Sequence, residues 1–105
     1  MKLWIDDMRP APRGYYWCRS VDEAKSAIIY YEDVLDYDMN RINSVELLDI
    51  DHDASEYARY GGDYIELLKW LEETGRSYPI HIHSMNPVGV ENMRRIIQRN
   101  GWKEI

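Results

Sequence analysis

An apolar run that ends abruptly in polar residues is the feature that most constrains the fold of this chain. The run 47–50 has the composition of a buried strand, apart from Asp49, and it is followed at once by Asp51, His52 and Asp53. A strand of this kind typically opens at its carboxyl end into a crevice, where open α/β sheets bind their ligands. The run therefore predicts a central strand, about residues 45–50, with a polar site at its end.

Two other apolar stretches end in the same way. Residues 3–5 are followed by Asp6 and Asp7, and residues 80–83, which alternate isoleucine with histidine, are followed by Ser84. Parallel strands bring their carboxyl ends to the same edge of a sheet. The three endings are therefore expected to form the walls of one site.

Capping and turn residues divide the rest of the chain into elements. Ser20 and Asp63 each begin a capping-box pattern, and Asn86 precedes Pro87 in the manner of a helix start. Strands are predicted at about 2–5, 15–18, 45–50 and 80–83, helices at about 21–31, 64–74 and 87–100, and a solvated linker at 32–38. Strands separated by helices predict a mostly parallel α/β sheet in a single domain, residues 1–105.

Charge and cysteine content narrow the class of protein. The formal net charge of −6 argues against an extended nucleic-acid-binding surface, which needs a basic face, but it leaves open a small phosphate-containing ligand or an RNA end. The only cysteine, Cys18, is expected to be a small buried hydrophobic residue of a strand. No signal peptide or membrane span is evident, so the expected location is the cytoplasm and the expected partners include no membrane.

All three histidines fall near predicted strand ends. His81 and His83 are two residues apart on one strand, so their side chains share a face, as two metal ligands or an acid–base pair would require. The alternative is one buried structural histidine and one surface histidine. His52 follows the central strand directly, so it is a third candidate for proton transfer.

The aspartates form a second set of candidates. Asp49, Asp51 and Asp53 share a parity and are expected to converge with Asp6 or Asp7. Carboxylates packed this closely need a cation or shifted pKa values. Oxygen ligands suit magnesium or manganese, which are the expected cations, and added imidazoles would favour manganese, iron or zinc, of which zinc and iron are the alternatives. For Asp53 the alternative is a turn or cap role.

A phosphate-binding set is predicted beside these residues. Ser84 and Asn86 lead into a helix start, whose free backbone N–H groups bind anions, although Ser84 would also serve simply as a cap. Arg9 and Arg13 lie on the loop after the acidic pair and would neutralise a phosphate from the other side. The alternative for each arginine is an exposed charge without a ligand.

The ordered set of motifs resembles that of response-regulator receiver domains, and more closely that of the offshoot called the cyclic-phosphate processing receiver domain. The similar stretches are residues 3–10, 48–53, 67–71, 80–87 and 100–102. The resemblance implies a receiver-like (flavodoxin-like) sheet of about four mostly parallel strands flanked by three helices. It also implies hydrolysis of a cyclic phosphate, in the setting of RNA repair or nucleotide signals.

Carried over position by position, the resemblance assigns roles to four positions. Asp6 and Asp7 would hold a divalent cation. Asp51, or as the second choice Asp49, would occupy the phosphoacceptor position, and Ser84 would contact the phosphoryl oxygens. The three histidines are additions that an ordinary receiver lacks.

Two parts of an ordinary receiver are absent from the pattern. Residues 6–14 are too short and too rich in breakers for the helix expected between the first two strands. No fifth strand with a phosphate-pairing lysine follows the last helix, where Lys103 is a poor substitute, so the expected fold is truncated at the C-terminus. Reversible phosphotransfer is therefore disfavoured, and the histidines would act as general acid and base on a cyclic phosphodiester.

We therefore expect a metal-dependent phosphoesterase that acts on cyclic or terminal phosphates of RNA ends or nucleotides. Its expected catalytic residues are Asp51, His52, His81 and His83, and its expected metal ligands are Asp6, Asp7, Asp49 and Asp51. The alternative is a non-catalytic receiver-like module that captures a nucleotide or a partner protein with the same crevice. The oligomeric state stays open.

Overall fold

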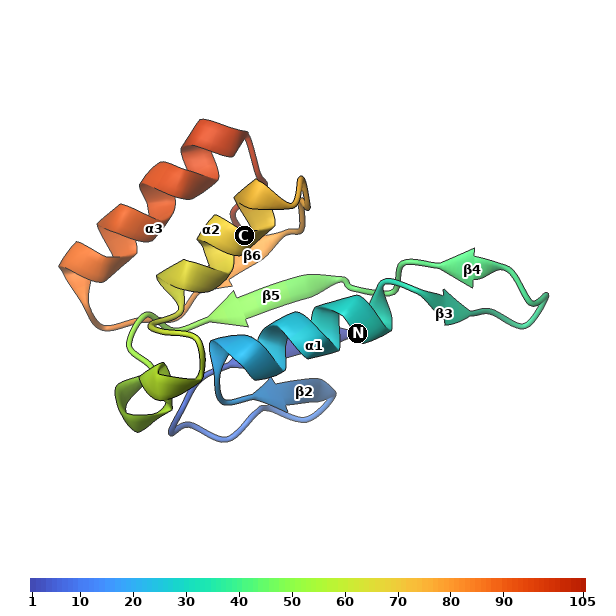
Figure 1. Ribbon diagram of the computed structural model, residues 1–105, viewed down its shortest axis with the longest axis horizontal. Helices are drawn as coiled ribbons and strands as arrows, with labels where there is room; N and C mark the ends of the chain where they lie inside the picture. The colour runs from blue at the N-terminus through green and yellow to red at the C-terminus, as the bar shows by residue number, and fades with distance from the viewer.

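A wholly parallel sheet of four strands lies at the centre of the computed structural model, which describes residues 1–105 (Figure 1). Its strands, in spatial order, are β2 (Tyr15–Cys18), β1 (Lys2–Ile5), β5 (Leu47–Ile50) and β6 (Ile80–Ile82). The helices are α1 (Val21–Tyr31), α2 (Ile65–Glu73) and α3 (Pro87–Asn100), and a short 3-10 helix, η1 (Ser55–Tyr60), follows β5. The predicted receiver-like α/β fold with four strands and three helices is confirmed.

Alternation along the strands decides which face of the sheet is buried. Leu3 and Ile5 of β1 pair in register with Leu48 and Ile50 of β5, and all four side chains are fully buried. They belong to one hydrophobic cluster that also contains residues of all three helices, and α1 and α2 cross in front of the strands in Figure 1. The helices therefore cover a single face of the sheet.

The opposite face carries the residues between these apolar ones. Trp17, Trp4, Asp49 and His81 are register partners across all four strands, so they form one row on this face. In place of a helix, the loop 6–14 covers part of the row, since the indole nitrogens of Trp4 and Trp17 donate to backbone carbonyls of this loop at 2.8 and 2.7 Å. The missing helix between β1 and β2 is thus confirmed, and the two strands are adjacent and parallel.

Two of the three predicted helix caps are present. Ser20 accepts a hydrogen bond from the backbone N–H of Glu23 at 3.1 Å, and Asn86 accepts one from Gly89 at 3.0 Å. Gly101 ends α3 with a φ of 67°, a left-handed conformation that glycine adopts without strain. None of the helices is long and apolar enough to cross a membrane.

The predicted cap at Asp63 is wrong. The helix α2 begins at Ile65, its N-cap residue is Tyr64, and no side chain caps it. The Asp63 carboxylate instead accepts a hydrogen bond from the backbone N–H of Ala54 at 3.0 Å. Ala54 is fully buried, so its N–H needs a partner, and Asp63 supplies one across the loop rather than at the helix start.

The predicted linker at 32–38 is part of a β-hairpin that projects from the body of the molecule (Figure 1). Its strands are β3 (Val34–Leu35) and β4 (Arg41–Ile42), paired antiparallel. The Asp36 carboxylate closes the turn by accepting backbone hydrogen bonds from Asp38 and Asn40 at 2.8 and 2.9 Å. Asp36, one of the acidic residues of this stretch, therefore stabilises the turn of the hairpin, as asparagine and aspartate commonly do.

The C-terminal residues lie beside β6, where a fifth strand would lie. The backbone N–H of Ile80 donates to Lys103 at 2.9 Å, and that of Ile105 donates to Ile80 at 2.8 Å. This pattern makes a single parallel bridge between Ile80 and Glu104. The C-terminal residues thus pair with β6 through one bridge, although the sequence predicted no strand after the last helix.

Candidate functional site

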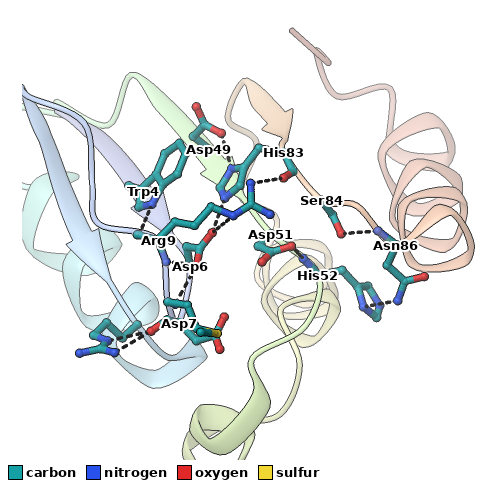
Figure 2. Close-up of polar contacts among 12 residues, drawn as sticks. Trp4, Asp6, Asp7, Arg9, Asp49, Asp51, His52, His83, Ser84 and Asn86 are labelled. Atoms are coloured by element: carbon teal, nitrogen blue, oxygen red, sulfur yellow. Dashed lines mark hydrogen bonds and ion pairs between the residues drawn. The ribbon is translucent and has the colours of Figure 1, made fainter.

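Three residues that follow neighbouring strands meet at one edge of the sheet (Figure 2). Asp6 follows β1, Asp51 follows β5, and His83 follows β6. One side-chain ligand atom of each lies within 4.8 Å of the others. We call these three residues the Asp–His cluster. The expectation that the three strand endings lie together is met by these residues.

His83 is held in one orientation by two carboxylates and an indole. Its Nδ1 lies 2.6 Å from Oδ1 of Asp49, and its Nε2 lies 2.9 Å from Oδ2 of Asp6. The imidazole stacks on the ring of Trp4 at 3.9 Å between centroids and 3° between planes. Only 9% of the His83 side chain is exposed, so the ring has little freedom to turn.

The charge state of His83 follows from this environment. Burial disfavours the imidazolium, but the hydrogen bonds to Asp49 and Asp6 favour it more strongly, so the pKa of His83 is raised above its ordinary value. Both ring nitrogens face carboxylate oxygens, so the charged form donates two hydrogen bonds where the neutral form donates one.

The raised pKa of His83 predicts how stability depends on pH when divalent cations are removed with EDTA. Because the folded state binds this proton more tightly, the contribution of His83 is fully present below the unfolded pKa, about 6.5, and is lost as the pH rises through the folded pKa. We expect the difference in free energy of unfolding between the wild type and His83→Gln to shrink with rising pH. Denaturant titrations at several pH values measure it, and a difference that grows would contradict the expectation.

Asp6 is the most buried carboxylate of the site, with a side chain 1% exposed. Its Oδ1 accepts backbone hydrogen bonds from Met8 and Arg9 at 2.9 and 2.8 Å, so the chain turns sharply after β1. The guanidinium of Arg9 lies at the rim, with Nε 3.8 Å from Asp6 Oδ2 and Nη1 3.5 Å from the carbonyl of His83. Arg9 is thus a half-exposed cation at the mouth of the Asp–His cluster.

Asp7 is buried but lies outside the Asp–His cluster. Figure 2 shows its carboxylate set apart from that of Asp6. Its backbone carbonyl accepts two hydrogen bonds from the Arg19 guanidinium at 3.0 and 2.7 Å. Arg19 in turn lies between the rings of Trp17 and Tyr57, 4.8 and 4.7 Å from their centroids. Arg19 therefore anchors the loop after β1 to η1, and sequence patterns gave no signal for this role.

His52 lies on the other side of Asp51 from His83 in the view of Figure 2. Its Nδ1 is 2.9 Å from Oδ1 of Asp53, and the Asn86 amide approaches both residues at 3.4 to 3.5 Å. The ring packs directly on Gly89, in the first turn of α3, where an added Cβ would lie 2.4 Å from Cγ of His52. A glycine inside a helical pattern is the sequence signal for such a close approach.

The other predicted residues lie around the Asp–His cluster. His81 sits within β6 and contacts the backbone carbonyl of Ile105 through Nδ1 at 2.9 Å, with no hydrogen bond to His83. Ser84 accepts a hydrogen bond from the backbone N–H of Asn86 at 3.1 Å, so both act as local caps in this structure. Arg13 is exposed and forms no hydrogen bond or ion pair. The catalytic, phosphate-binding and metal-binding roles assigned from the sequence stay predictions.

The buried Cys18 lies on the helix-covered side of the sheet, away from these groups. Burial, and to a smaller extent the charge of Glu23, raises the pKa of its thiol to about 12. Because the thiolate is the reactive form, Cys18 has no nucleophilic role near neutral pH. Its placement agrees with the prediction of a small buried hydrophobic residue.

The strands of the sheet lie in the order β2-β1-β5-β6, so the first strand of the chain lies between the second and the third. This strand order is that of the flavodoxin-like class. With acidic residues after β1 and β5 and a serine after β6, the fold defines a receiver-like domain. The family model for the cyclic-phosphate processing receiver domain matches residues 1–99, and the chain belongs to that family. No curated protein and no solved structure matches the chain. The family predicted from the motifs is confirmed.

Proposed function

We propose that this protein is a metal-dependent phosphoesterase that hydrolyses cyclic or terminal phosphates of RNA ends or nucleotides. The observation that carries the proposal is the convergence of Asp6, Asp51 and His83 within 4.8 Å at the carboxyl edge of the sheet. Membership of the cyclic-phosphate processing receiver domain family supports the substrate class.

The donor atoms of the Asp–His cluster fit a divalent cation. Two carboxylates and one imidazole form a mixed oxygen and nitrogen set, which suits manganese, iron or zinc better than magnesium. Asp49, hydrogen-bonded to the far nitrogen of His83, is placed as the carboxylate that orients a ligating imidazole. A bound cation would supply electrostatic stabilisation of the phosphoryl oxygens during hydrolysis.

Proton transfer falls to His52 in this proposal. In the tautomer with the proton on Nδ1, His52 donates to Asp53 and keeps the lone pair on Nε2 free to accept a proton from an attacking water. The backbone N–H of His52 donates to Oδ1 of Asp51 at 2.8 Å, so a phosphate held beside Asp51 would lie next to the residue that carries this imidazole. His52 is therefore the residue that we assign as general base.

Arg9 would pair with the negative charge of the substrate phosphate. Its half-exposed guanidinium borders the Asp–His cluster and retains donors for a phosphate oxygen. The Ser84 hydroxyl accepts one hydrogen bond from Asn86, and its proton stays free to donate to a second phosphate oxygen. These two side chains would orient the phosphate, while the buried Asp6 would not contact it.

Turnover of a defined substrate tests the proposal. Purified protein is incubated with RNA that ends in a cyclic phosphate, and with cyclic nucleotides, in manganese or in EDTA. We expect product only with the metal, and a loss of at least about a hundredfold in Asp51→Asn, because the substitution removes a charged member of the Asp–His cluster. Asp38→Asn, an exposed aspartate of the hairpin, is the matched control and should keep wild-type activity.

Two results would count against a metal-dependent phosphoesterase. If no product forms with manganese, magnesium, zinc or iron, and Asp51→Asn still binds the nucleotide, the non-catalytic binding module is the better account. If product forms equally in EDTA, the metal has no part in the reaction. Metal affinity, measured by calorimetry with manganese alone, separates failure to bind the cation from failure to bind the substrate.

A further inference from the structure

The largest cavity of the molecule, about 610 Å³, lies away from the Asp–His cluster, between α1, the edge strand β2 and the end of η1. Its volume falls within the range of small-molecule sites. We call it the tyrosine groove. Four aromatic rings and two carboxylates dominate its lining: Tyr16, Tyr30, Tyr31, Tyr60, Asp22 and Glu23.

The rings meet at steep angles, so they form walls around a space rather than a stack. Tyr30 and Tyr31 have centroids 4.9 Å apart and planes at 87°, and Tyr16 and Tyr31 are 5.7 Å apart at 66°. Tyr16, Tyr30 and Tyr60 are exposed, although they are large and partly apolar. Faces of aromatic rings carry negative electrostatic potential, so such walls attract a positive charge.

The charges around the groove have one sign. Asp22 and Glu23 line it, and no lysine or arginine does. Glu23 uses one oxygen to accept a hydrogen bond from the backbone of Arg19, which leaves the other free. Burial and the neighbouring phenols raise the pKa of Tyr31, so its ring stays neutral at physiological pH.

The chain's own cations do not fill this space. Arg19 lies over Trp17 and Tyr57, and Lys25 and Arg76 lie over Trp70. Arg59 lies over Tyr60 at 5.6 Å, but no lysine or arginine lies over Tyr16, Tyr30 or Tyr31. Three of the four rings therefore have no cation of the chain over them, and the groove combines these aromatic walls with two carboxylates.

We propose that the tyrosine groove binds an organic cation of the ammonium or guanidinium class. The cation would contact the ring faces and pair with Asp22 and Glu23. It would come either as a free small molecule or as a lysine or arginine side chain of a partner protein. Phosphate-bearing ligands are disfavoured here because both charged groups of the lining are anionic. The site is separate from the Asp–His cluster and does not depend on the proposed phosphoesterase activity.

A titration with a cation and its uncharged analogue tests the proposal. Full-length protein is titrated with choline and with dimethylbutanol, its neutral carbon isostere, while nuclear magnetic resonance shifts of the tyrosine rings and backbone amides are followed. We expect saturable shifts at α1 and β2, with choline bound about two- to thirtyfold more tightly than the isostere. A blocked arginine amide in a parallel arm distinguishes a partner side chain from a free cation, and tight binding of either supports the proposal.

Matched variants locate the site. Tyr30→Ala removes one exposed wall of the groove and should weaken choline binding at least twofold, whereas Tyr37→Ala, an exposed tyrosine of the hairpin, should not change it. Equal affinity for choline and the isostere would overturn the proposal, as would binding that is unchanged in Tyr30→Ala. Saturable shifts of the groove with adenosine monophosphate but not with choline would assign the groove to a nucleotide and overturn it as well.

Discussion

In the His83→Gln variant, the proposed activity is expected to fall by a factor of about one hundred or more. The free energy of unfolding is expected to fall by about 3–5 kcal/mol. The large effect follows from burial, because the side chains of His83 and of its partners Asp6 and Asp49 are all at most 9% exposed. Glutamine retains hydrogen-bonding groups but carries no positive charge. Below the raised pKa of His83, the variant would therefore leave two buried carboxylates without the positive charge that the imidazolium places between them.

His81→Gln is the matched control for this experiment. It lies on the same strand, two residues earlier, but it contacts only a backbone carbonyl of the C-terminal residues. We expect it to change the free energy of unfolding by no more than about 1 kcal/mol. Equilibrium denaturation in EDTA gives the stabilities, and turnover in manganese gives the activities. Equal losses in the two variants would show that the position of His83 between Asp6 and Asp49 has no special importance.

The Gly89→Ala variant is expected to lose about 1–3 kcal/mol of the free energy of unfolding, although alanine is normally the better helix former. The added Cβ would lie 2.4 Å from Cγ and 2.7 Å from Nδ1 of His52. These atoms are near the root of the imidazole and not at a flexible end, so the whole ring must move. The displacement would also break the contact with Asp53 and lower the proposed activity.

The sign of the effect should reverse when the imidazole is removed. In the His52→Ala background the clash is absent, so Gly89→Ala should stabilise the protein by about 0.5–1 kcal/mol through helix propensity. A double-mutant cycle of the two positions, measured by denaturant unfolding, gives the coupling directly. A coupling near zero would contradict the close packing of His52 on α3.

Local sequence signals predicted most of the helices and strands. These predictions were correct where an element depends on residues that are close to one another in the sequence. The helix 21–31 agrees residue for residue with α1, because Ser20 and the apolar spacing are both local. Asp63 matched the same capping pattern, yet its carboxylate accepts a hydrogen bond from Ala54, nine residues earlier. The hairpin β3–β4 was missed for a different reason, since two-residue strands leave almost no periodicity in a sequence.

The sequence by itself determined the family, the fold class and the strand endings that meet at the site. Those features depend on residue type and on spacing within each strand. Only the tertiary structure decided which carboxylate meets which imidazole: Asp6 and Asp49 hold His83, Asp53 pairs with His52, and Asp7 lies apart. The physical reason is that side chains alternate between the two faces of the sheet only within a strand, so the sequence predicts their directions only there. Beyond that point the direction of each side chain depends on how the loop turns, and on backbone donors such as those of Met8 and Arg9.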